Sequence, residues 1–143
     1  MIFRRQLYDY DCAITAIYNL FVFFQKKIPL DNPIEKDFPT GAEGDINFQL
    51  IIDKLKGYFT FDEVLTFNPN NIFDKVKSGR VILVQKFDFS LNHHVELLIP
   101  SKLPNCITIV NSMDSDNILQ DYTRWQFFKT RFLRCFLGLV INV

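Results

Sequence analysis

Hydrophobic residues in the first part of the chain recur at intervals of three and four, which is the spacing of one face of a helix. This pattern predicts a helix from Cys12 to Phe24 that packs against a core. Asp11 stands at the N-cap position, so Cys12 is expected to be the first helical residue. A second helix is predicted from about Asp45 to Leu55 and a short third helix from Asn70 to Lys77. Helices are therefore expected before any strand.

The later part of the chain has shorter apolar runs that are typical of β-strands. Strands are expected at Arg80 to Phe87, His93 to Ile99, Cys106 to Asn111 and Phe132 to Val143. The first three have short polar connections, which predict neighbouring antiparallel strands. The segment from Tyr122 to Thr130 has a mixed pattern and is assigned to neither class. The order indicates an α+β fold, with N-terminal helices packed on a C-terminal antiparallel β-sheet.

Length and charge narrow the class of protein. The chain has 143 residues, with 16 acidic and 16 basic side chains and a formal net charge of zero. This length supports one core and no linker divides it, so we expect a single domain of residues 1–143. The zero net charge argues against a general nucleic-acid-binding protein. No apolar run reaches the roughly 18 residues that span a bilayer, and the N-terminus lacks a signal-sequence pattern. We expect no nucleic-acid partner, no membrane partner and a cytoplasmic location. The sequence leaves the oligomeric state open.

The three cysteines are read singly, because their odd number and spacing predict neither a disulfide framework nor a zinc site. Cys106 and Cys135 lie in apolar runs and are expected to be core thiols. Cys12 opens a helix, where unpaired amide groups and the positive end of the helix dipole favour the thiolate. The neighbouring Asp11 opposes this effect, so the thiolate also needs an imidazolium partner. Cys12 is the candidate nucleophile, and a small buried residue at a helix start is the simpler alternative.

Other polar residues stand where they could complete a thiol site with Cys12. The pair His93 and His94 opens a predicted strand, and an imidazole there could protonate the leaving group. Asn111 ends the next predicted strand; its carbonyl could hold that imidazole, or it could be an ordinary turn residue. Gln6 could donate to a developing oxyanion, beside the backbone amide of Cys12. Neighbouring strand residues point to opposite faces, so the two histidines cannot easily bind one metal. We expect no metal and no cofactor.

In this order the residues resemble the papain-like cysteine peptidases. Residues 91–95 (LNHHV) are similar to the family's Asn-His-Ala-Val strand, and residues 107–112 (ITIVNS) are similar to its apolar strand ending in Asn-Ser-Trp. The family places its base two residues before a valine, which matches His93, and His94 stays as the alternative. The resemblance covers nearly the whole chain in order and implies a papain-like cysteine protease fold.

Within that family, the double-glycine leader peptidases that trim bacteriocin precursors are the most similar branch. Residues 11–13 (DCA), 44–45 (GD) and 78–81 (SGRV) stand at the branch's Asp-Cys-Gly, Gly-Thr and Gly-Arg-Pro motifs. Ala13 replaces the usual glycine, and Met113 stands where the wider family has tryptophan. The branch has Asp-Pro in place of Asn-Ser, so Asp114 gains weight as a rival to Asn111, with Asp116 as a further candidate.

The resemblance also implies a function. Cys12 would attack an amide, His93 would carry the proton, Asn111 would orient His93 and Gln6 would help to bind the oxyanion. The substrate would be a peptide or a protein. A papain-like acyltransferase would use the same thioester with an amine as acceptor. A non-catalytic structural or binding protein of a virus or phage, which keeps the fold alone, is the other alternative.

Overall fold

The computed structural model describes residues 3, 12–26, 48–87, 93–110, 118–132 and 134–142. Helices and strands in these segments follow one another as α1 (Cys12–Phe23), α3 (Phe48–Leu55), β1 (Thr60–Thr66), α4 (Pro69–Lys77), β2 (Val81–Phe87), β3 (His93–Pro100), β4 (Cys106–Val110), β5 (Leu119–Thr123), α5 (Arg124–Arg131) and β6 (Cys135–Asn142). None of the described helices is long and apolar enough to cross a bilayer.

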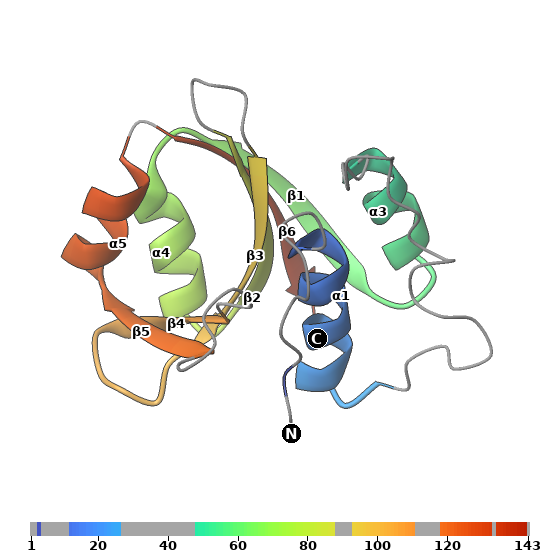
Figure 1. Ribbon diagram of the computed structural model, residues 1–143, viewed down its shortest axis with the longest axis horizontal. Coiled ribbons are helices and arrows are strands. Elements are labelled where there is room, and N and C mark those ends of the chain that lie inside the picture. Colours follow the sequence, from blue (N-terminus) through green and yellow to red (C-terminus); the bar gives the residue numbers. More distant parts are fainter. Residues whose placement is uncertain are drawn as a thin grey trace.

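The strands form one curved antiparallel sheet in the order β1-β6-β2-β3-β4-β5. Helices α1 and α3 lie on one side of this sheet, and helices α4 and α5 lie on the other (Figure 1). The α+β architecture expected from the sequence is confirmed. The expected pairing of the three consecutive strands is also confirmed, because β2, β3 and β4 are antiparallel neighbours.

Alternation along the strands divides the core into two hydrophobic clusters, one on each face of the sheet. On β3, the odd-numbered residues Val95, Leu97 and Ile99 belong to the cluster that contains the buried side of α1. The even-numbered Leu98 belongs to the cluster that contains α4 and Phe127 of α5. Successive strand residues point to opposite faces. On β3, odd-numbered residues therefore face α1, and even-numbered residues face α4 and α5.

The order of elements differs from the expectation that helices precede strands. Strand β1 comes before α4, and α5 lies between β5 and β6. The mixed segment 122–130 is the junction of β5 and α5, where Thr123 and Gln126 form a capping box. Strand β1 is an edge strand that carries Asp62 and Glu63, and edge strands commonly have charges that discourage further pairing. Such charges interrupt the alternation by which a strand is recognised.

Candidate active site

Helix α1 brings Cys12 to the face of the sheet formed by the odd-numbered residues of β3. Cys12 is the first residue of α1, and the helix packs against β3. Its buried residues Ala13, Ile17 and Leu20 share one cluster with Val95 of β3. In Figure 1, α1 runs alongside β3 on this side of the sheet. The helix that begins with Cys12 and the strand that begins with His93 thus pack against each other on one face of the sheet.

His93 opens β3, where its backbone pairs with Phe87 of β2. The side chains of Cys12 and His93 lie outside the described part of the structure, as do Gln6, Asn111 and the alternatives Asp114 and Asp116. The structure therefore packs the helix that begins with Cys12 against the strand that begins with His93. The roles of the individual side chains stay predictions.

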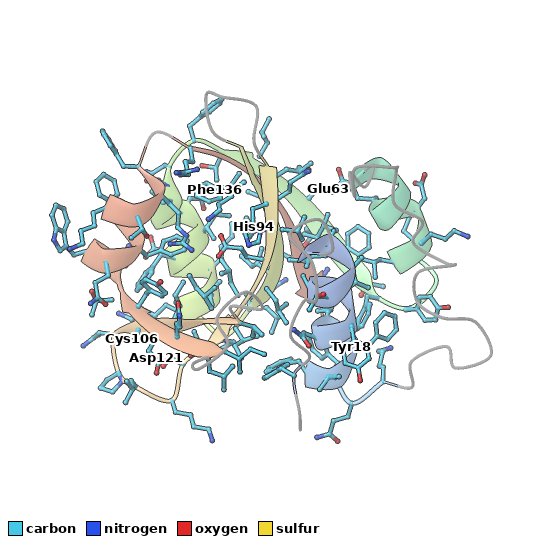
Figure 2. The ribbon with its side chains drawn as sticks, viewed as in Figure 1. Tyr18, Glu63, His94, Cys106, Asp121 and Phe136 are labelled. Carbon is cyan, nitrogen blue, oxygen red and sulfur yellow. The ribbon has the colours of Figure 1, made fainter. Side chains whose placement is uncertain are left out.

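His94, the alternative base, is on the other face of the sheet. It pairs with Lys86 on β2. The charges of Glu96, Lys86 and Arg131 are close enough to its ring to affect its pKa (Figure 2). Burial lowers the pKa of His94, Glu96 opposes this change, and the two cations lower the pKa further. The sheet itself separates this imidazole from α1.

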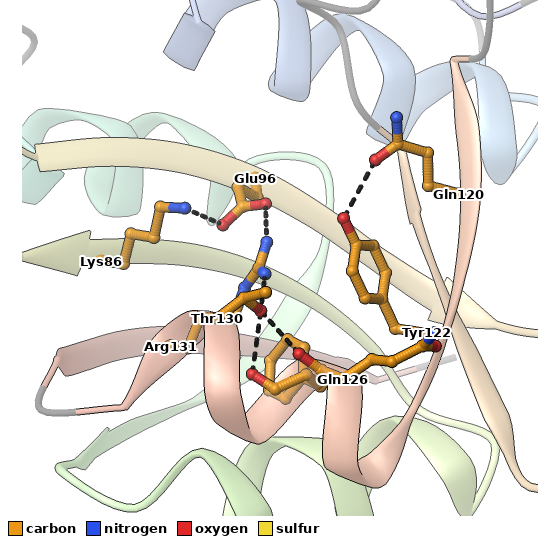
Figure 3. Close-up of polar contacts among 8 residues, drawn as sticks. Lys86, Glu96, Gln120, Tyr122, Gln126, Thr130 and Arg131 are labelled. Carbon is orange, nitrogen blue, oxygen red and sulfur yellow. Dashed lines mark hydrogen bonds and ion pairs between the residues drawn. The ribbon is translucent and has the colours of Figure 1, made fainter.

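A buried ion cluster surrounds Glu96 on that second face (Figure 3). Lys86 Nζ lies 3.0 Å from Glu96 Oε1, and Arg131 Nη2 donates to Glu96 Oε2 at 2.8 Å. The Arg131 guanidinium also lies over the ring of Tyr122, 5.3 Å from its centroid. Burial raises the pKa of Glu96, but Arg131 and Lys86 outweigh it and lower the pKa to about 2. The cluster links β2, β3 and α5 on the face of the sheet opposite to α1.

The lowered pKa of His94 predicts a loss of stability in mildly acidic solution. The unfolded state, with a pKa near 6.5, takes up a proton before the folded state does. Stability should therefore fall as the pH drops through that value, until the pH is below the pKa of the folded protein. Urea unfolding at several pH values should show this fall, and His94→Gln should remove it. Glu96 acts separately, because its contribution is lost only between pH 4.5 and about 2. An unchanged pH profile in His94→Gln would contradict the assignment.

A hollow lies at the C-terminal end of α1. It has a volume of about 430 Å³ and is lined by Phe24, Lys26, Lys56, Gly57, Tyr58, Phe59, Thr60 and Asn142. Phe24 is about 18 Å from Cys12 along the helix axis, at 1.5 Å per residue. This hollow is therefore not part of the site at the start of α1. Among the described side chains, no group of three His, Cys, Asp or Glu residues could hold a metal ion.

Solved structures with the same architecture were found by comparison of the fold. The peptidase domain of Streptococcus ComA, a bi-functional ABC transporter involved in a quorum-sensing pathway, superposes with a TM-score of 0.62. The match covers 95% of this chain and 96% of that domain, at 13% identity. The chain has the fold of these peptidase domains. The peptidase domain of Streptococcus mutans ComA, in complex with a small-molecule inhibitor, gives a TM-score of 0.52 at 12% identity and covers 96% of this chain and 98% of that one.

The ComA comparison confirms the expected α+β fold, with helices packed on an antiparallel sheet. At 12 to 13% identity the likeness concerns the fold and not the chemistry. No family model and no curated protein matches the sequence. Sequence reasoning did not find the Lys86–Glu96–Arg131 cluster, because its members come from three elements that only the folded sheet brings together. The one signal available was a glutamate within an otherwise apolar strand.

Proposed function

We propose that the protein is a cysteine peptidase that cleaves amide bonds in a peptide or protein substrate. The observation that carries the proposal is the packing of α1, which begins with Cys12, against β3, which begins with His93. The fold similarity to ComA peptidase domains supports the same reaction class. Both lines of support concern backbone placement, so the side-chain roles below are predictions.

In the proposed reaction, the Cys12 thiolate attacks the carbonyl carbon of the substrate amide. The protonated imidazole of His93 gives its proton to the leaving nitrogen as the C–N bond breaks, and a thioester remains on Cys12. Water, deprotonated by His93, then attacks the thioester and releases the acid product. The backbone amide of Cys12 and the side chain of Gln6 are the proposed donors to the oxyanion formed in each step.

The division of the sheet into two faces favours His93 over His94 as the base. Val95, Leu97 and Ile99 face α1, and strand alternation assigns His93 to that same face. His94 interacts with Lys86 and Glu96 on the opposite face. A base that reacts with a thiol on α1 has to be on the α1 face, so His93 is the residue that we propose.

The orienting group is Asn111 or Asp114 in this proposal. Asn111 follows directly after Val110, the last residue of β4, which pairs with Leu97 of β3. If the pairing of β3 with β4 continued beyond Val110 and Leu97 without a bulge, Asp114 would lie opposite His93. A bulge, or an early end of the ladder, would favour Asn111. Single variants Asn111→Ala and Asp114→Asn distinguish them, because loss of the orienting group should lower turnover far more than loss of the other residue.

A thiol-reactive probe tests the proposed ion pair without knowledge of the substrate. Iodoacetamide should label Cys12 in the folded protein well below the pH at which Cys106 and Cys135 react, since a thiolate paired with imidazolium persists at lower pH. In His93→Ala the rate at Cys12 near neutral pH should fall at least about tenfold. His94→Ala is the matched control and should leave the rate nearly unchanged. Equal labelling of all three cysteines, or equal effects of the two histidine variants, would contradict the proposal.

A further inference from the structure

Helix α5 and Phe132, the residue that follows it, present three aromatic rings on their outer surface. Trp125 is 66% exposed and Phe132 is 56% exposed, and Phe128 lies between them. The ring centroids of Trp125 and Phe128 are 6.1 Å apart, and those of Phe128 and Phe132 are 5.6 Å apart. Spacings of three and four residues place the rings along one side of the helix. We call Trp125, Phe128 and Phe132 the aromatic stripe.

The aromatic stripe is not used by the core of the protein. The opposite side of α5 buries Phe127 and Arg131 against the sheet and α4. The helix lies at the outer edge of the molecule, beyond α4 and on the far side of the sheet from α1 (Figure 1). Large rings that are in mutual contact and exposed to water mark a surface that binds something apolar.

The charged side chains of α5 itself are basic. The helix carries Arg124, Lys129 and Arg131 and no Asp or Glu. Arg124 pairs with the exposed Asp74 of α4, and Arg131 pairs with the buried Glu96. Lys129 is exposed in the last turn of α5, among the rings. An anionic apolar surface would complement this arrangement.

We propose that α5 docks the protein on the surface of an anionic lipid bilayer. Aromatic rings beside basic side chains are typical of helices that lie in the membrane interface. A specific protein interface buries about 800 Å² on each partner and needs a complementary shape, whereas a lipid surface needs none. The expectation of no membrane partner rested on the absence of a spanning segment, which surface docking does not require.

Docking through α5 has a consequence for the orientation of the protein. Because α5 and α1 lie on opposite faces of the sheet, α1 would lie on the side of the sheet away from the lipid (Figure 1). The candidate active site would then stay open to a substrate in solution. The docking surface and the catalytic proposal are independent, since neither uses residues of the other.

Trp125 is the one tryptophan of the chain, so its fluorescence reports directly on the stripe. Phosphatidylcholine vesicles that contain phosphatidylglycerol should shift the emission of the full-length chain to shorter wavelength and co-sediment with it. Pure phosphatidylcholine vesicles should bind more weakly, and added salt should weaken binding to the anionic vesicles. Phe132→Ser should weaken partitioning about tenfold. Lys129→Gln should weaken it about fivefold.

The loop between β3 and β4 supplies matched controls, because Lys102 and Leu103 are an exposed cation and an exposed apolar residue there. Lys102→Gln and Leu103→Ser should bind anionic vesicles as the unchanged protein does. No emission shift with anionic vesicles, while circular dichroism shows a folded chain, would overturn the proposal. Equal effects of the loop and α5 variants would also overturn it. A blue shift that depends on protein concentration without vesicles would indicate self-association through the stripe instead.

Discussion

Cys12→Ala is expected to abolish amide cleavage, with turnover reduced by at least about 10⁴-fold, because no thioester can form without the thiol. The variant should still fold, since alanine is a good helix former and Cys12 stands at the first position of α1. The assay is incubation with a mixed peptide library, followed by mass spectrometry for new termini. Urea unfolding of the same preparation checks that the fold is kept.

Cys106→Ala is the matched control for the Cys12 prediction. Cys106 is a free, partly buried thiol at the start of β4, at the opposite end of that strand from Asn111. Its removal should leave turnover within about twofold of the unchanged chain. Retained cleavage in Cys12→Ala would contradict the proposed nucleophile. Products joined to an added amine, lost in Cys12→Ala, would identify acyl transfer by the same thioester.

Glu96→Leu is expected to have the largest effect on stability, a loss of about 3 to 5 kcal/mol. The leucine would leave Arg131 buried and Lys86 largely buried, with no negative charge between them. The cost arises because both cations have lost their solvation, and Glu96 supplies the ion pairs that replace it. Urea unfolding with Glu96→Leu, Arg131→Met and the double variant would measure the coupling between the two charges.

The exposed pair of Arg124 and Asp74 is the matched control for the Glu96 prediction. It is also a carboxylate paired with an arginine of α5, but its side chains are 44% and 61% exposed. Asp74→Asn should cost less than about 1 kcal/mol, because water already solvates both charges. A loss as small for Glu96→Leu as for Asp74→Asn would show that the buried cluster does not stabilise the fold.

The parts of the fold that local patterns predict are those with one buried side or a continuous apolar run. Helix α1 and strands β2 and β3 were predicted to within a few residues because their apolar residues repeat with a clear period. Strands β1 and β5 are the two edges of the sheet. In β1 the adjacent charges Asp62 and Glu63 interrupt the alternation, and in β5 the exposed Leu119 and the half-buried Gln120 reverse the expected pattern. Helix α5 buries only Phe127 and Arg131, too few residues for a helical period to be recognised.

The candidate site could be predicted from the sequence in part. The first residue of α1 and the first residue of β3 are local features, visible in the capping position and in the apolar run that follows. That both lie on one face depends on how α1 packs across the sheet, which no local pattern contains. That Arg131 lies beside His94 and Glu96 likewise depends on contacts between residues 35 or more positions apart.

The placement of β6 constrains how the sheet can assemble during synthesis. Strand β6 is the last of the described strands to be made, yet it lies between β1 and β2. Until it leaves the ribosome, β1 has no described neighbour in the sheet, whereas β2, β3, β4 and β5 can already pair in sequence order. The nascent chain therefore holds an unpaired strand and an open edge on β2, both of which are sites for unwanted association. Insertion of β6 gives both β1 and β2 a hydrogen-bonded neighbour at once. It also joins β1 to the antiparallel strands β2 to β5.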